Sequence, residues 1–173
     1  MSEVIILAGP NGAGKTTFAR EYRLARQKPL VFVNADEIAR ELTDQGLSQG
    51  QMDIRAARIM IERIDDLAEA SADFMFETTL ATLTYTHKIR RWRAQGYSVS
   101  LIYLRLPSVE DSIARVRRRV EAGGHAIPVG IIRRRFNKSM SYFESTYKSI
   151  VDEWYVRDSV EGTFIVAESW DQK

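Results

Sequence analysis

The feature that most constrains this chain is a loop near its start. Residues 9–16 read Gly-Pro-Asn-Gly-Ala-Gly-Lys-Thr and match the pattern G-x-x-x-x-G-K-[ST] at every position. They follow a short apolar run, Val4 to Ala8, that fits a buried parallel strand, and the sequence from Lys15 onward reads as a helix. The order of strand, glycine loop and helix therefore predicts a phosphate-binding loop, and the alternative is a glycine-rich turn that matches by chance.

Each part of this loop has a distinct expected role. Glycines let backbone amides curl around a phosphate, and the N-terminus of the following helix adds partial positive charge. Lys15 can reach the β- and γ-phosphates of a nucleotide, and the Thr16 hydroxyl can coordinate Mg²⁺. The sequence thus predicts ATP and Mg²⁺ as cofactors, with these nucleotide-binding residues: Gly9, Pro10, Asn11, Gly12, Ala13, Gly14, Lys15, Thr16 and Thr17. GTP is not expected, because residues 137–140 read Asn-Lys-Ser-Met and lack the aspartate that reads guanine.

Length and composition favour an ordinary globular enzyme domain. The 173 residues fit a single domain spanning residues 1–173, with 45% hydrophobic and 28% charged residues and no cysteine. The N-terminal apolar run is too short for a signal peptide or membrane span, so we expect a cytoplasmic protein with no membrane partner. The net charge is only +2, but residues 105–138 hold nine Arg and Lys against three Asp and Glu.

Acidic residues follow two predicted strands. Asp36 comes soon after the apolar run 30–33, where an open α/β sheet binds its ligands, and it could accept a hydroxyl proton or hold Mg²⁺ through water. Glu77, Thr78 and Thr79 follow the run 73–76, and they could orient Mg²⁺ water or bind substrate oxygens. Helix capping is the alternative role for both groups.

The basic stretch predicts a mobile helical lid over residues 115–135. One helix begins near Ser108 and carries Arg115 and Arg119, Gly123-Gly124 ends it, and a second helix begins near Pro128 and carries Arg134. Lid arginines can offset charge that develops on a transferring phosphoryl group and can help to exclude water. His125, in the hinge, could contact a phosphate or substrate. The alternatives are a solvated surface or a nucleic-acid patch.

Three further elements complete the expected sheet and its cover. A helix from Gln51 to about Ala70 should bury Ile54, Ala57, Ile61, Ile64 and Leu67. The helix that begins near Pro128 should continue through Phe143, Tyr147, Ile150 and Trp154, and residues 163–167 should form the fifth strand. Phe136, Tyr142 and Trp154 are spaced for core packing rather than base stacking, so we do not expect nucleic acid as a partner.

In order and spacing these motifs resemble the zeta-toxin-like family of P-loop kinases, particularly its short members. The matching blocks cover nearly the whole chain: Gly9 to Thr17, residues 34–36, residues 76–79, and the run from Arg115 through Gly123-Gly124-His125 to Arg134-Arg135-Phe136. The resemblance implies an α/β, three-layer P-loop NTPase fold of kinase type, with a five-stranded parallel sheet flanked by helices and a helical lid. It also implies ATP-dependent phosphorylation of a hydroxyl on UDP-N-acetylglucosamine or a related nucleotide sugar, and a small antitoxin protein as partner.

The resemblance also assigns roles to individual residues. Lys15 and Thr16 match the nucleotide and metal positions, and Asp36 matches the acid that serves as base for the sugar hydroxyl. Glu77 and Thr79 resemble the acid and hydroxyl near the substrate, and the lid arginines correspond to Arg115 and Arg119. His125 stands near a second arginine of longer toxins, for which Arg134 or Arg135 could substitute. A small-metabolite kinase and a regulatory ATPase are the alternative functions.

Overall fold

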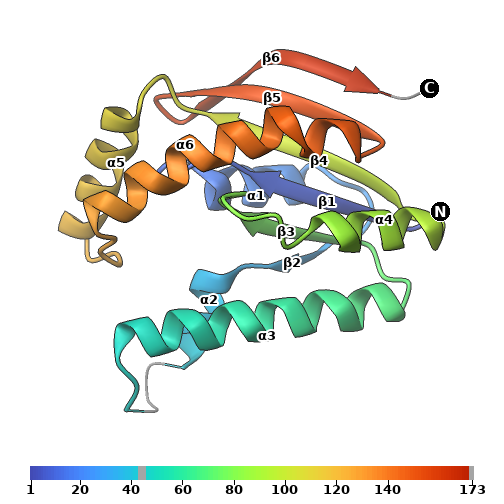
Figure 1. The fold of residues 1–173 in the computed structure, drawn as a ribbon, viewed down its shortest axis with the longest axis horizontal. Coiled ribbons are helices and arrows are strands. Elements are labelled where there is room, and N and C mark those ends of the chain that lie inside the picture. Colours follow the sequence, from blue (N-terminus) through green and yellow to red (C-terminus); the bar gives the residue numbers. More distant parts are fainter. Residues whose placement is uncertain (43–45, 172–173) are drawn as a thin grey trace.

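A computed structural model describes residues 1–42 and 46–171 of the chain (Figure 1). Its strands are β1 (Glu3–Ala8), β2 (Val31–Val33), β3 (Phe74–Thr78), β4 (Ser98–Arg105), β5 (Glu153–Val160) and β6 (Thr163–Asp171). Its helices are α1 (Lys15–Leu24), α2 (Ala35–Glu41), α3 (Gln49–Glu69), α4 (Thr86–Ala94), α5 (Val109–Glu121), α6 (Val129–Ser145) and the 3-10 helix η2 (Tyr147–Ser149). Across the described ranges, no helix has both the length and the apolar character needed to cross a bilayer.

The strands form one six-stranded sheet in the order β2-β3-β1-β4-β5-β6. Five neighbouring strands run parallel, and β6 pairs antiparallel with β5. Strand β1 lies between β3 and β4, so the phosphate loop that follows it emerges in the middle of the sheet, beside the end of β3. This is the edge of an open parallel sheet at which ligands bind.

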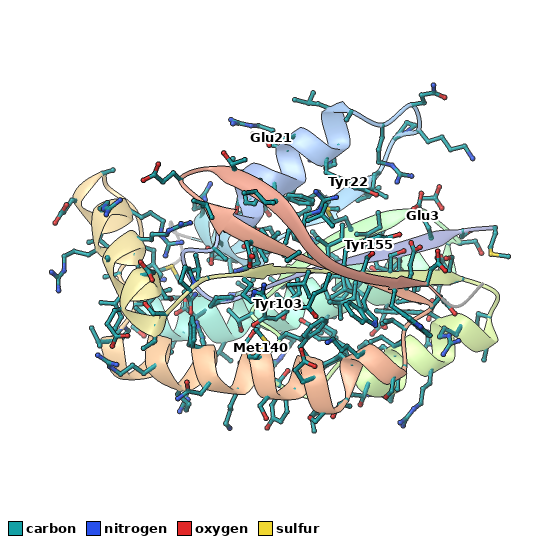
Figure 2. The ribbon with its side chains drawn as sticks, turned by 90° about the horizontal axis from the view of Figure 1, so that it is seen from above. Glu3, Glu21, Tyr22, Tyr103, Met140 and Tyr155 are labelled. Atoms are coloured by element: carbon teal, nitrogen blue, oxygen red, sulfur yellow. The ribbon has the colours of Figure 1, made fainter. Side chains whose placement is uncertain are left out.

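Side-chain alternation along β1 explains why helices cover both faces of the sheet. Val4, Ile6 and Ala8 face one hydrophobic cluster, which receives side chains from α2, α3, α4 and α6. Ile5 and Leu7 face a second cluster, which includes residues of α1. Figure 2 shows Tyr22 of α1 on one side of the sheet and Met140 of α6 on the other. The strand is buried on both faces, which is why it reads as a continuous apolar run.

The expected number of parallel strands is correct, and residues 163–167 do form a strand, but that strand is antiparallel and the fifth parallel strand is β5. Trp154 lies on β5, not on the last helix, because α6 ends at Ser145 and η2 turns the chain back into the sheet. Trp154 still packs on the core, where its ring meets Phe143 edge-to-face at 5.9 Å. The segment 163–167 belongs to the antiparallel strand β6, which closes a hairpin with β5 through a two-residue turn in which Glu161 and Gly162 both have positive φ, as a type I′ turn requires.

The buried face of α3 agrees with the expected one only in part: Ile64 is buried, and Ile61 and Leu67 are half-buried against the core. The fully buried row is Ala56, Met60, Ile64 and Ala68, which follows four-residue steps. Ile54 is 69% exposed, and Ala57 is exposed as well. The two rows overlap at Ile64, so periodicity placed the buried face approximately but not its centre. The small side chains of the alanines mark the row that packs most closely.

Candidate active site

The phosphate loop has the backbone geometry that its glycines permit. Gly9 has a φ of 144°, and a Cβ at this position would lie 2.4 Å from the carbonyl oxygen of Leu104, so only glycine fits. Gly14 is the N-cap of α1 and provides no side-chain hydrogen bond. The first amides of α1 therefore have no side-chain cap, which leaves them available to an anion.

Lys15 lies inside this loop rather than in solvent. Its side chain is 7% exposed, and its Nζ donates hydrogen bonds to the carbonyl oxygens of Gly9 and Pro10, both at 3.0 Å. Burial lowers the pKa of Lys15, and the negative charges of Glu77 and Asp36 oppose that shift. The cradle thus holds a cation at its centre, with carboxylates close by.

A hydrogen-bonded triad joins the loop to the ends of the two neighbouring strands. The Thr16 hydroxyl donates to Oε2 of Glu77 at 2.9 Å, and Nδ2 of Asn34 donates to the same oxygen at 2.8 Å. Burial raises the pKa of Glu77, while Lys15 and Thr16 oppose the shift. One hydroxyl and one carboxylate are the kind of protein ligands that Mg²⁺ takes when water and phosphate complete its shell. Thr16 and Glu77 therefore fit a magnesium site.

Asp36 lies in the first turn of α2, and the cap of that helix is a different residue. Oδ1 of Asn34 accepts the backbone amides of Asp36 at 2.7 Å and of Glu37 at 3.4 Å. The Asp36 carboxylate is exposed, yet close enough to act electrostatically on Lys15 and Glu77. Asn34 rather than Asp36 therefore caps α2 with its side chain, and a role of Asp36 toward a substrate hydroxyl stays a prediction.

The two threonines after Glu77 differ in what they contact. Oγ1 of Thr78 accepts the backbone amide of Leu80 at 3.0 Å, which supports the turn after β3, where Leu80 has a φ of 56°. Thr79 is half-buried in the same turn. A substrate role for either threonine remains a prediction.

The arginines of α5 face two different surroundings. Arg115 donates from Nη1 to Oγ of Ser159 at 2.8 Å and from Nη2 to the Ser159 carbonyl at 2.9 Å, so its guanidinium binds the end of β5. Its Nη1 also reaches the carbonyl oxygen of Gly12 in the phosphate loop at 3.5 Å. Arg119 is exposed, lies close enough to lower the pKa of Lys15, and donates to the carbonyl of His125 at 3.2 Å. Arg119 thus acts electrostatically on the loop lysine, while Arg115 joins the end of β5 to the loop backbone at Gly12.

On α6, Arg135 is the residue whose charge acts on the loop lysine. It is half-buried, and its own pKa is lowered by burial and raised by Asp53 and Asp36. Arg134, the predicted substrate contact, is exposed beside it. His125 lies 3.9 Å from Asp53, measured between Nε2 and Oδ2. The start of α3 therefore faces the lid through Asp53.

Sequence reasoning missed four residues of this arrangement as site residues. Asn34 could have been found, because an Asn followed by acidic residues at the end of a strand is a helix-capping pattern. Arg135 was named only as a substitute for another arginine. Asp53 and Ser159 carry no local signal, because their positions depend on how α3 and β5 pack.

A hollow of about 320 Å³ adjoins this site on the side of α1. Thr16 and Thr17 lie at one end, and Arg20, Arg23 and Phe32 line the rest with Glu37. The two guanidinium groups in this hollow suit an anionic ligand.

The fold and this loop define a P-loop NTPase of kinase type. Residues 4–145 match the family model AAA_33, described as an AAA domain, and the chain belongs to that family. A relative in Haemophilus influenzae, an uncharacterized protein, is 28% identical over 135 residues, which are 78% of this chain and 93% of the relative.

Solved structures agree on the fold. A chain of the AvrRxo1-ORF1:ORF2 complex with ATP matches 98% of this chain with a TM-score of 0.74 and 16% identity, but only 58% of its own length is covered. A chain of the PezAT chromosomal toxin-antitoxin system of Streptococcus pneumoniae has a TM-score of 0.70 and 19% identity, over 98% of this chain and 72% of that one. A sugar kinase from Janibacter has a TM-score of 0.53 and 21% identity, over 91% and 86%.

Proposed function

We propose that this protein is an ATP-dependent phosphotransferase that phosphorylates a hydroxyl of a small acceptor, with UDP-N-acetylglucosamine or a related nucleotide sugar as the leading acceptor. The observation that carries the proposal is the group formed by Lys15, the Thr16–Glu77 hydrogen bond and the exposed Asp36 carboxylate at one edge of the sheet. The kinase and toxin-antitoxin structures that share the fold support it.

Each residue has a defined task in this proposal. The loop amides and Lys15 bind the phosphates, while Thr16 and Glu77 hold Mg²⁺, with Asn34 fixing the carboxylate. ATP supplies the phosphoryl group, and Mg²⁺ offsets the charge of the phosphate oxygens when bound. A carboxylate oxygen of Asp36 accepts the proton of the acceptor hydroxyl.

Two arginines of the segment 115–135 add positive charge near the phosphate loop. The charges of Arg119 and Arg135 act on Lys15, so they can offset negative charge that develops above the loop. Arg115 stays in the proposal as the residue that fastens the lid to β5, with a direct catalytic role still a prediction. The resemblance to zeta toxins also supports a small antitoxin protein as a partner.

The nucleotide-sugar acceptor is supported by the cations beside the loop. Arg20 and Arg23 line the hollow that adjoins Thr16, where they can bind the diphosphate of such a molecule. Phe32 lies in the same hollow, with the Arg23 guanidinium 5.6 Å from its ring centre. A free sugar would bring no phosphate to these two cations.

The test is transfer of labelled phosphate from ATP, with Mg²⁺, to a panel of nucleotide sugars, free sugars and nucleosides. We expect one nucleotide sugar to be labelled, with transfer lost in Lys15→Ala and reduced at least about 100-fold in Asp36→Asn. Glu41→Gln is the matched control, because Glu41 is an exposed carboxylate at the other end of α2. Hydrolysis of ATP without any labelled acceptor, unchanged in Asp36→Asn, would favour a regulatory ATPase instead.

A further inference from the structure

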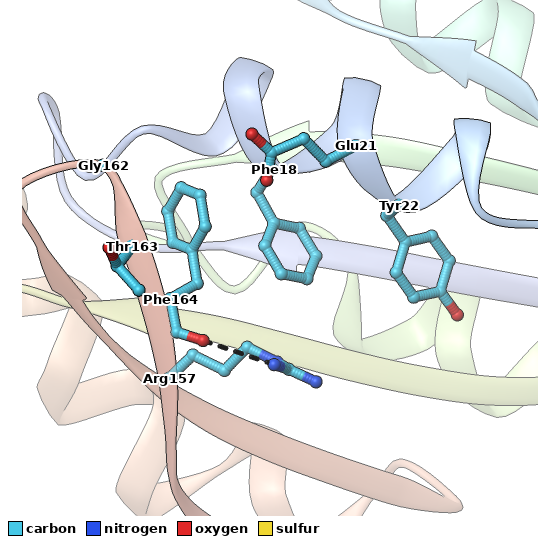
Figure 3. A pocket seen from close by; sticks show the side chains of 7 residues that line it. All are labelled: Phe18, Glu21, Tyr22, Arg157, Gly162, Thr163 and Phe164. Carbon is cyan, nitrogen blue, oxygen red and sulfur yellow. Dashed lines mark hydrogen bonds between the residues drawn. The ribbon is translucent and has the colours of Figure 1, made fainter.

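A second hollow, of about 330 Å³, lies between α1 and the β5–β6 hairpin (Figure 3). Three aromatic rings stand along it, those of Phe164 from the hairpin and of Phe18 and Tyr22 from α1. Phe18 meets Phe164 edge-to-face at 5.2 Å and is stacked with Tyr22 at 5.8 Å. We call this hollow the aromatic slot, and its walls suit a flat ring.

The floor of the aromatic slot carries a positive charge. Arg157 lies beneath Phe18, with its guanidinium carbon 5.5 Å from the ring centre, and its Nη1 donates to the Phe164 carbonyl at 3.4 Å. Within residues 1–42 and 46–171, no carboxylate forms an ion pair with Arg157, and its buried Nε has no hydrogen-bond partner. An uncompensated cation under aromatic walls favours a ligand that is both flat and rich in hydrogen-bond acceptors.

The rim of the slot adds an acceptor group. Glu21 projects from α1 over Phe18 in Figure 3, and its side chain is exposed. A carboxylate at the rim can accept hydrogen bonds from an amino group, while Arg157 donates from the floor. A ring that bears both acceptors and an amino group matches this pair, and such a ring is a nucleobase.

The slot begins where the phosphate loop ends. A Cβ on Gly14 would lie 3.2 Å from Cζ of Phe164 and 4.0 Å from Oγ of Ser159. The Phe164 ring therefore touches the N-cap of α1, whose amides face the phosphate site. A ligand with phosphates in the loop and a ring in the slot needs only a short polar link between the two.

We propose that the aromatic slot binds the nucleobase of the phosphate donor, with the base against Phe164 and its polar groups toward Arg157 and Glu21. This inference rests on the proposed function, because it takes the donor to be a nucleotide. It assigns the β5–β6 hairpin, which lies outside the matched family segment 4–145, to recognition of the donor.

The test compares two ligands by calorimetry in the presence of Mg²⁺: ATP, and inorganic tripolyphosphate, which has no base. We expect the intact protein to bind ATP at least about tenfold more tightly than tripolyphosphate. Phe164→Ala should lower the affinity for ATP about tenfold, which corresponds to the loss of one base–aromatic stack, and should leave the affinity for tripolyphosphate unchanged. Tyr22→Leu should act in the same direction. Ile165→Ala is the matched control, because this neighbour on β6 is 55% exposed and does not line the slot.

Two results would overturn the inference. Equal affinity for ATP and tripolyphosphate in the intact protein would show that the base makes no contact. An equal loss of affinity for ATP and for tripolyphosphate in Phe164→Ala would show that the ring only supports the loop. If the intact protein binds neither ATP nor tripolyphosphate, the proposed function itself fails. If it binds both equally, and Lys15→Ala weakens both, the phosphate site stands and only the aromatic slot is wrong.

Discussion

Replacement of Arg115 by alanine should cost stability more than it costs chemistry. Its guanidinium donates two hydrogen bonds to Ser159, at 2.8 and 2.9 Å, and Ser159 is 1% exposed. A hydrogen bond to a charged group contributes about 1.5–3 kcal/mol. Because one guanidinium makes both bonds and water can partly replace it, we expect a loss of about 2–3 kcal/mol, or a fall in Tm of about 5–10 °C for a chain of this size.

Arg119→Ala is the matched comparison, because both arginines lie on α5 one helical turn apart. Arg119 is exposed, so its removal should change the free energy of unfolding by less than about 0.5 kcal/mol. It should nevertheless slow phosphoryl transfer by about 100-fold, the loss found when one donor to a developing negative charge is removed. The assays are urea unfolding followed by circular dichroism and single-turnover transfer from labelled ATP. Unchanged unfolding of Arg115→Ala together with lost transfer would refute the anchoring argument.

Three further substitutions test the surrounding structure. Tyr103→Phe should make the loss of stability at alkaline pH less steep. Burial raises the pKa of Tyr103 to about 12, so between pH 10 and 12 the unfolded chain loses this proton while the folded chain keeps it, which destabilises the fold. In urea unfolding over that range, the free energy of unfolding of the intact protein should fall more steeply than that of the variant, by up to about 1.4 kcal/mol per pH unit. Asn34→Ala should cost about 1–2 kcal/mol in urea, because α2 loses its cap, and should slow transfer because Glu77 loses a donor; an unchanged rate would contradict that second role. Gly9→Ala should abolish ATP binding in calorimetry, since its Cβ would lie 2.4 Å from a carbonyl oxygen of β4, and binding at wild-type strength would disprove the steric argument.

Local patterns predicted the loop and its strand well. The run Val4 to Ala8 and the glycines of residues 9–14 impose a strand, a turn with positive φ and a helix start within one short segment, so no distant contact is needed to predict them. Asp36 and Glu77 were found because they follow predicted strands, and carboxyl ends of parallel strands meet at one edge.

The features that the sequence did not predict depend on contacts between residues far apart in the chain. The apolar residues Tyr147, Ile150 and Trp154 continue a helical spacing, but η2 turns the chain and Trp154 reaches the core from a strand. The partner of Arg115 on β5 could not be found without that strand. The proximity of Asp53 to His125 depends on the placement of α3 against the lid, which no local pattern encodes.

The central claim is that the phosphoryl group goes to an acceptor rather than to water. The most direct measurement is a phosphorus NMR time course of ATP, Mg²⁺ and the protein with a mixture of nucleotide sugars. The account predicts a new phosphomonoester resonance that grows in step with ADP, and neither signal in Lys15→Ala. Growth of ADP together with inorganic phosphate alone would contradict it.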